Sequence, residues 1–111
     1  MFEPELLPLP DAATALGIDI LKIRQYVRDG QLLAIRGEDG VLRVPADFIA
    51  EGRVVKHLPG VITLLRDNRF SDEEAVQWLF TPDDTLPGPP IQALRENRGT
   101  EVKRRAQALG W

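Results

Sequence analysis

A chain of 111 residues with a formal net charge of −3 is long enough for one compact domain, or for two small lobes that share a core, and too acidic overall for a strong nonspecific nucleic-acid binder. The absence of cysteine excludes disulfides and thiolate metal sites, and the single His57 cannot assemble a metal centre without several carboxylates. No stretch approaches the roughly 20 apolar residues that span a bilayer, and no basic segment followed by an apolar run opens the chain, which indicates a cytoplasmic protein.

The first predicted helix begins near Pro10, because proline tolerates the first helical position. It extends to Leu16 and ends at Gly17, which suits the left-handed conformation that often terminates a helix. Asp19 is placed to accept hydrogen bonds from the free amides of the next helix. The sequence therefore predicts a helix-turn-helix with its turn over residues 17–19.

The second predicted helix is amphipathic and ends at Gly30. Its apolar side consists of Ile20, Ile23 and Val27, which recur at three- and four-residue spacing. Its polar side consists of Lys22, Gln25 and Arg28, with Arg24 at the border. Arginine and lysine pair with guanine edges and glutamine with adenine edges, so this face suits a DNA major groove.

A two-stranded hairpin is predicted directly after this helix. Strand candidates at 32–36 and 41–44 flank the sequence Gly37-Glu38-Asp39-Gly40, whose Asp-Gly step favours a hairpin turn. Arg36 and Arg43 lie near the ends of the hairpin, where they can contact a DNA backbone. Two short helices followed by a basic hairpin predict a winged helix-turn-helix.

A local basic patch is compatible with the acidic total, because seven Lys and Arg residues fall between the turn and the next predicted long helix. Their phosphate contacts should be few, and the affinity modest and salt-sensitive. The two alternatives are a solvated charged face without function and a module that binds another protein. The residues expected to contact DNA are Lys22, Arg24, Gln25, Arg28, Arg36, Arg43, Arg53 and Lys56.

Five further helical segments are predicted after the hairpin. A short turn of helix follows Pro45, and residues 53–56 form a basic connector to a helix that Pro59 opens and that ends near Asn68. Ser71 and Glu74 match a capping box ahead of an apolar helix. These elements divide the chain into a winged helix-turn-helix lobe, residues 1–57, and a C-terminal helical lobe packed on it, residues 58–111.

The last part of the chain is predicted to contain a stiff, extended loop over 81–90, because it holds four prolines. A short helix after the loop should end at Gly99, and Thr100 should cap the last helix. Trp78 is expected in the core because it lies at helical spacing among apolar residues. The run Lys103-Arg104-Arg105 is expected to favour solubility and the helix dipole, with a phosphate-binding surface as the alternative.

No nucleophile and base, glycine-rich phosphate loop or metal-ligand spacing occurs in the sequence. The cluster Asp72-Glu73-Glu74 lies where a helix dipole favours anions and is interpreted as capping rather than as acid/base chemistry. We therefore expect no enzyme and no cofactor. The apolar strip of the last predicted helix is too short for a coiled coil, so a monomer is expected.

Several motifs resemble one family across nearly the whole chain. The most specific are VVKHLPG, WLFTPD and VKRRAQA, which follow the segment LPDAATALGIDILKIRQYVRDGQLLAIRGEDGVLRVPADFI. Together they resemble actinobacterial winged helix-turn-helix DNA-binding proteins that are substrates of a transmembrane Ser/Thr protein kinase, with a MerR- or excisionase-like first half. The resemblance implies a mainly helical fold with a small β-hairpin, binding to double-stranded DNA and transcription regulation. It also implies a Ser/Thr kinase as a partner, although the threonine modified in such relatives precedes the first helix and this sequence has none before Thr14.

A second resemblance concerns the C-terminal half alone. The segment EEAVQWLFTPDDTLPGPPIQALRENRGTEVKRRAQAL looks like the C-terminal domain of Xre- and ParS-type antitoxins, with Asp83 where they have asparagine. That resemblance implies binding to a toxin or another protein partner. An adjacent toxin gene would distinguish this alternative from DNA binding as the main function.

Overall fold

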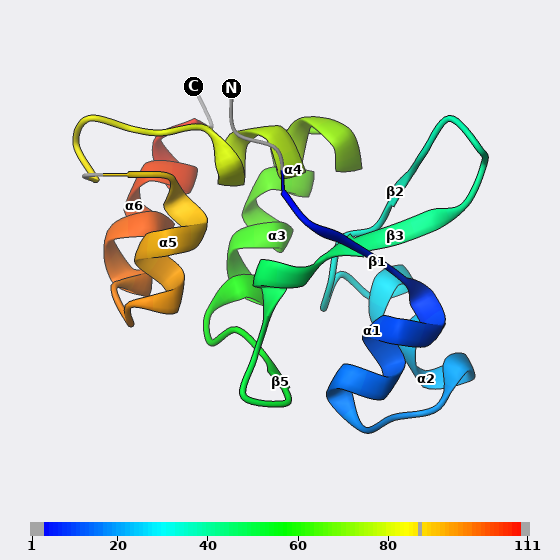
Figure 1. Cartoon of the computed structure of the whole chain (residues 1–111). Coiled ribbons are helices and arrows are strands. Elements are labelled where there is room, and N and C mark those ends of the chain that lie inside the picture. The colour runs from blue at the N-terminus through cyan, green and yellow to red at the C-terminus, as the bar shows by residue number, and fades with distance from the viewer. Residues whose placement is uncertain (1–3, 87, 110–111) are drawn as a thin grey trace.

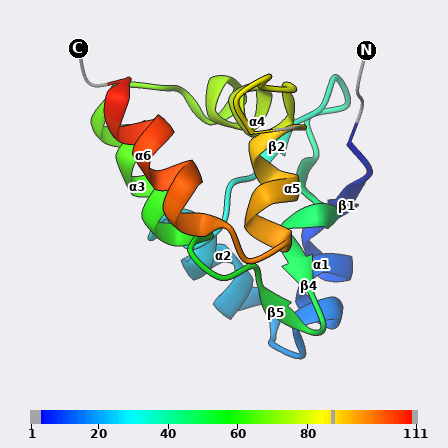
Figure 2. The same cartoon turned by 90° about the vertical axis from the view of Figure 1, so that its left-hand side faces the viewer.

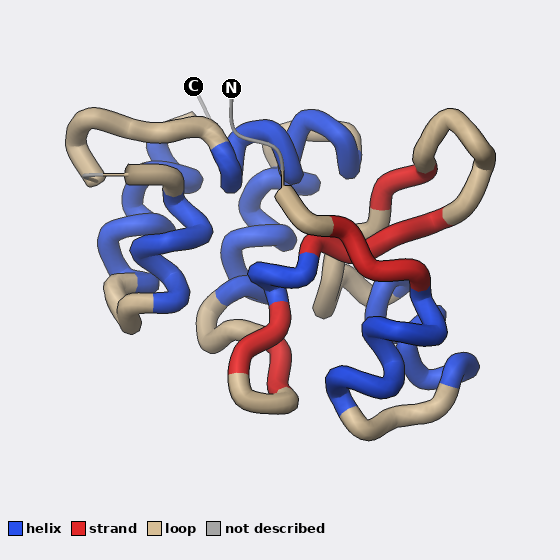
Figure 3. Tube along the Cα trace, in the orientation of Figure 1, coloured by secondary structure: helices blue, strands red, loops and turns tan. Residues whose placement is uncertain are grey.

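A computed structural model describes residues 4–86 and 88–109. Two helical groups lie on either side of short strands, with α1 and α2 in one group and α3 to α6 in the other (Figures 1 and 3). The elements in chain order are β1 (Leu6–Pro8), α1 (Leu9–Leu16), α2 (Ile20–Arg28), β2 (Ile35–Arg36), β3 (Leu42–Pro45), the 3-10 helix η1 (Ala46–Phe48), β4 (Ile49–Ala50), β5 (Arg53–Val54), α3 (Leu58–Asp67), α4 (Asp72–Phe80), α5 (Pro90–Arg95) and α6 (Gly99–Ala108). The predicted mainly helical winged helix-turn-helix fold is confirmed.

The helix-turn-helix forms where its capping residues predict it. Gly17 takes a left-handed φ of 67°, and the next amide, Ile18 N, donates to Ala13 O at 3.0 Å. Such a left-handed residue ends a helix by satisfying its last carbonyls. Asp19 then caps α2, because its Oδ1 accepts from Lys22 N at 2.8 Å. The turn therefore fixes the start of α2 as well as its direction.

The main sheet has three antiparallel strands in the order β1-β3-β2. The hairpin of β2, β3 and the turn between them, hereafter the wing, was predicted from its Asp-Gly step. Its first strand is shorter than predicted: Leu32 and Leu33 are fully buried and contribute to the core, and only Ile35–Arg36 pairs with β3. Strand β1 was not predicted, because three residues ending in proline give a weak strand signal.

A second hairpin, β4–β5, replaces the predicted connector over residues 53–56. Ala50 pairs with Arg53, which leaves a two-residue loop at Glu51 and Gly52. Both loop residues have positive φ, 54° and 76°. Positive φ at both positions is the conformation of a type I′ turn, one of the two turn types favoured in two-residue hairpin loops. The prediction was wrong because it used Gly52 only to end the preceding turn of helix.

The helices α3 and α4 begin as predicted. Pro59 lies in the first turn of α3. The capping box of α4 is complete, with Glu74 N donating to Ser71 Oγ at 3.1 Å and Ser71 N donating to Glu74 Oε1 at 2.8 Å. The bond to the Ser71 amide lowers the pKa of the Glu74 carboxyl. These contacts support the interpretation of the acidic cluster as capping.

The loop before α5 is folded back rather than extended. Asp83 N donates to Gly88 O at 3.0 Å, and Asp83 Oδ1 accepts from Thr85 N at 2.8 Å. Leu86 is fully buried between these residues and belongs to the hydrophobic core. The prolines predicted a stiff loop, but the burial of one leucine draws the chain back onto the helices.

Gly99 begins α6 and does not end α5, which corrects the predicted boundary. Helix α5 ends at Arg95, and Asn97 takes the left-handed conformation with φ of 64°. A Cβ at Gly99 would lie 2.4 Å from His57 Cδ2, so only glycine permits this close approach. Thr100 consequently lies inside α6 and not at its cap.

One hydrophobic cluster contains residues from both helical groups. Phe48 is fully buried, and its ring stacks on that of Phe80 with 5.7 Å between centroids. Arg95 adds polar links by donating to Asp47 O at 2.9 Å and Ile49 O at 3.0 Å. Figure 2 shows α5 beside the β4–β5 region that these bonds reach. The boundary between residues 57 and 58 stays a prediction.

Trp78 is half-buried, which corrects its expected place inside the core. It packs against the hydrophobic cluster and also lines a surface hollow with Pro82 and Pro90. A partly exposed ring should stabilise the fold by less than a fully buried aromatic. Within the described ranges, no helix combines the length and apolar character needed to cross a membrane.

Candidate nucleic-acid interface

The exposed face of α2 is polar and centres on Gln25 and Arg28. Ile23 on the opposite side is fully buried and anchors the helix to the core. Arg24, Gln25 and Arg28 are exposed and recur at the spacing that keeps side chains on one helix face. Ile20 departs from its predicted burial, because 38% of its surface is exposed. The helix therefore presents its cations and its amide outward on a rigid support.

One flank of α2 faces the wing across a hollow of about 360 Å³. Arg24 from α2 and Arg36 from β2 both line this hollow, and Ile20 and Val41 contribute apolar surface. No hydrogen bond or ion pair of Arg24 is found among the described residues. Its five donors are therefore available to an external acceptor.

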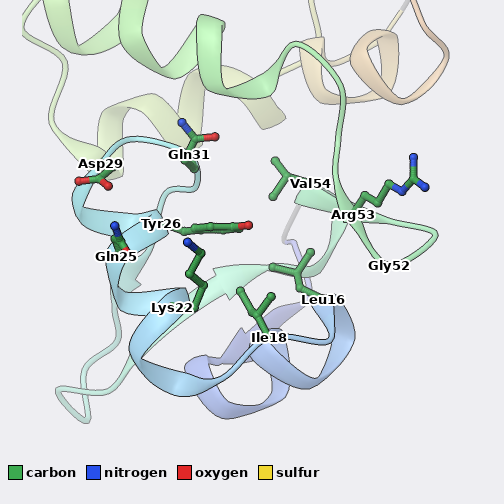
Figure 4. A pocket seen from close by; sticks show the side chains of 10 residues that line it. All are labelled: Leu16, Ile18, Lys22, Gln25, Tyr26, Asp29, Gln31, Gly52, Arg53 and Val54. Atoms are coloured by element: carbon green, nitrogen blue, oxygen red, sulfur yellow. The ribbon is translucent and has the colours of Figure 1, made fainter.

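The other flank of α2 faces the β4–β5 hairpin across a hollow of about 410 Å³. Lys22 Nζ lies 5.7 Å from the centroid of the Tyr26 ring, a cation–π geometry. Figure 4 shows this pair on one wall of the hollow and the Arg53 guanidinium pointing away from it. Arg53 and Lys22 therefore border the same hollow without converging on one point.

The two wing arginines are engaged within the wing itself. Arg43 donates to both carboxylate oxygens of Asp39, at 3.1 and 2.7 Å. The hydrogen bond from Arg43, with help from Val41 N, lowers the pKa of Asp39 to about 2. Arg36 donates to the carbonyl of Gly40 in the turn. The charge of Arg43 is thus paired within the hairpin, whereas Arg36 keeps its net charge because its partner is a neutral carbonyl.

Lys56 lies apart from the other predicted contacts. It lines a hollow of about 200 Å³ with Leu94, Arg95 and Asn97, on the side of α5. Arg53 borders this hollow too, so it is positioned between α2 and the C-terminal helices. The structure brings Lys22, Arg24, Gln25 and Arg28 together on one helix, places Arg36 beside them and leaves Lys56 outside.

The basic run of α6 is partly engaged in structural contacts. Arg105 Nε donates to Thr85 Oγ1 at 2.8 Å, which ties α6 to the proline-rich loop. A Cβ at Gly60 would lie 3.2 Å from Lys103 Cε, so this lysine passes close to α3. In residues 4–86 and 88–109, no group of three His, Asp or Glu side chains could hold a metal ion.

Leu21 is the feature of α2 that the sequence analysis did not single out. It is 74% exposed and lies one turn before Gln25 and Arg24. Its signal in the sequence was weak, because a leucine in an amphipathic helix is normally assigned to the buried side.

Comparisons with known proteins agree with the winged helix-turn-helix fold. A family model for the wHTH domain of DNA-binding protein Rv2175c matches residues 3–49, and a model for the Rv2175c C-terminal domain, described as of unknown function, matches residues 55–110. DNA-binding protein Rv2175c from Mycobacterium tuberculosis is 38% identical over 115 residues, which covers 93% of this chain and 79% of the relative. The NMR structure of Rv2175c superposes with a TM-score of 0.88 at 36% identity, covering 98% of this chain and 83% of that one.

These matches confirm the family that the motifs indicated. The kinase connection stays a prediction, as does the antitoxin-like alternative for the C-terminal lobe. Both the winged first half and the specific second half are matched, in the order in which they occur in the relative. The chain belongs to the Rv2175c family.

Proposed function

We propose that this protein binds double-stranded DNA through α2 and regulates transcription, without catalysis or a cofactor. The observation that supports the proposal most is the exposed face of α2, where Arg24, Gln25 and Arg28 project from a helix anchored by buried Ile23. A short helix beside a hairpin suits insertion into a major groove. The family, whose relative is named a DNA-binding protein, supports the same function.

The side chains of α2 differ in the contacts that they can make. Gln25 can form two hydrogen bonds with an adenine edge, and Arg28 can form two with a guanine. Arg24 faces the hollow beside the wing, where a phosphate would lie between it and Arg36. Lys22 keeps its ammonium at the edge of the helix, over Tyr26. We expect it to contact a backbone phosphate rather than a base.

The remaining predicted contacts are weaker. Arg43 neutralises Asp39, so it shapes the wing more than it attracts phosphate. Arg53 can reach a backbone next to α2, whereas Lys56 faces α5. The carboxylates of Asp19 and Asp29 stand at the two ends of α2 and repel phosphate nearby. Binding should consequently use few phosphates, so that the affinity is modest and decreases with salt with a slope set by only those few contacts.

Selection from a random pool of duplexes at low salt tests the proposal. The wild-type protein should enrich a short motif, and Gln25→Ala should relax preference at one defined position and cost about 1–3 kcal/mol. Gln107→Ala is the matched control, because Gln107 is an exposed glutamine on α6. Absence of any enrichment or binding by a folded protein would contradict DNA binding as the function.

We also infer that the protein acts as a monomer and, from the family resemblance, that a Ser/Thr kinase regulates it. A monomer contacts one half-site, whereas two-fold dimers bind half-sites about one helical turn apart. The selected motif should therefore be short and lack two-fold symmetry. Light scattering that shows a stable dimer, together with a palindromic motif, would contradict this assignment.

A further inference from the structure

Exposed apolar side chains gather around α2 and the wing. Among the described residues, the large hydrophobic side chains with substantial exposure are Ile20 at 38%, Leu21 at 74%, Val41 at 42% and Leu109 at 39%. Ile20 and Val41 line the hollow between α2 and the wing, so their exposed surfaces face the same hollow. Leu21 is the most exposed of the four and does not line that hollow.

Folding does not account for Leu21. The helix is capped by Asp19, whose carboxylate accepts from Lys22 N, and it is anchored by Ile23, which is fully buried. Leu21 contributes to neither contact. Single exposed hydrophobic residues are common on protein surfaces, so exposure alone would carry no conclusion. The position of Leu21 on the helix supplies the second observation.

Around the helix axis, Leu21 lies in the middle of the polar face that is proposed to enter the major groove. Arg24, Gln25 and Arg28 follow it at three, four and seven residues, the spacing of one helix face. It is also the second residue of α2. In helix-turn-helix proteins the N-terminal residues of the recognition helix contact base edges. In that docking mode a leucine at this position would face bases and not phosphates.

The major groove contains one apolar group, the C5-methyl of thymine. We propose that Leu21 contacts a thymine methyl and so contributes to sequence specificity, an inference that rests on the proposed DNA binding. Gln25 one turn later pairs with adenine. Residues four apart on a helix have Cβ atoms about 5–6 Å apart, and base pairs are stacked about 3.4 Å apart. The two side chains therefore recognise adjacent or next-adjacent A·T pairs.

Replacing thymine by uracil tests the inference, because uracil pairs identically and lacks only the methyl group. The probe is a duplex enriched by the wild-type protein, compared with the same duplex containing uracil at every thymine. Wild-type affinity should fall about fourfold, the equivalent of one methyl-sized apolar contact. For Leu21→Ala the two duplexes should bind equally, and Leu21→Met should restore part of the difference.

Arg28→Ala provides the matched control. It should weaken binding to both duplexes while keeping the ratio between them, because it removes a polar contact and leaves the leucine in place. Circular dichroism should show unchanged folding for Leu21→Ala, since the side chain is outside the core.

The possible failures are distinguishable. Binding with equal affinity for thymine and uracil duplexes, or a ratio that persists in Leu21→Ala, overturns the role of Leu21 and leaves DNA binding in place. Lack of binding to any duplex by the folded wild-type protein overturns both proposals. Self-association that is lost in Leu21→Ala, without methyl dependence, would assign this surface to a protein contact and also overturn the inference.

Discussion

Helix α2 and the wing both carry arginines, yet they hold them differently. Arg24 on α2 has no hydrogen bond or ion pair among the described residues, and Arg28 approaches Asp29 only at 3.8 Å with 73% of its side chain exposed. In the wing, Arg43 is joined to Asp39 by two hydrogen bonds, and 27% of its side chain is exposed. The number of lysines and arginines in a segment therefore does not measure how many phosphates it can bind, because some of these side chains are already paired within the protein.

The two regions also differ in what supports them. Ile23 anchors α2 from below, so Ile23→Ala should lower the free energy of unfolding by about 2–5 kcal/mol. Urea denaturation followed by circular dichroism measures this. Leu21→Ala on the same helix is the control and should change stability by less than about 0.5 kcal/mol. Equal losses of stability in the two variants would contradict the account in which α2 is held to the core through its buried side alone.

DNA affinity should depend more on α2 than on the wing. Arg28→Ala should weaken binding about tenfold, the size expected for the loss of a good base contact. Arg43→Ala should weaken it only about twofold, because Asp39 already neutralises the arginine. Fluorescence anisotropy with one labelled duplex compares the two variants directly. A larger loss of affinity for Arg43→Ala than for Arg28→Ala would contradict the proposal that α2 contributes more to DNA binding than the wing does.

Removing the carboxylate that pairs with Arg43 tests the same difference between α2 and the wing. Asp39→Asn removes the charge that holds Arg43, so the freed guanidinium can approach a phosphate and DNA affinity should rise by about two- to threefold. The double variant Asp39→Asn with Arg43→Ala is the control and should lose the gain. A drop in affinity for Asp39→Asn alone would show that the shape of the turn matters more than the freed charge.

Titration of Asp39 measures the pairing itself. Its pKa is lowered to about 2 from the ordinary 3.8, so the ion pair stabilises the folded wing above about pH 4 and this contribution disappears as the pH falls toward 2. Carboxyl chemical shifts in an NMR titration should have a midpoint near the lower value. Arg43→Ala should move the midpoint back toward the ordinary range, while Arg36→Ala should leave it in place.

Local signals in the sequence predicted the elements that depend on neighbours in the chain. Gly17 and Asp19 define the turn, and Ser71 with Glu74 defines the start of α4, because each of these residues satisfies backbone groups within three or four positions. The same is true of the wing turn. Strand β1, in contrast, exists only because β3 lies beside it.

Several of the missed features depend on contacts between distant residues, whereas the missed β4–β5 hairpin is a local element. Gly99 was assigned to a helix end because its close approach to His57 is invisible in the sequence. Leu86 was assigned to an extended loop, because its burial against the helices cannot be read from the local sequence. For the candidate site, the sequence predicted which cations lie on α2, but it could not show that Arg43 pairs with Asp39 or that Lys56 faces α5.

The salt dependence of duplex binding tests the central claim that α2, more than the wing, holds the DNA. The slope of log affinity against log salt decreases by roughly 0.9 for each phosphate contact that is lost. We expect the triple variant Lys22→Ala, Arg24→Ala and Arg28→Ala to flatten this slope by one to two such contacts, and the double variant Arg36→Ala and Arg43→Ala to flatten it by at most one. A wing variant that flattens the slope more than the α2 variant, with both proteins folded, would contradict the account.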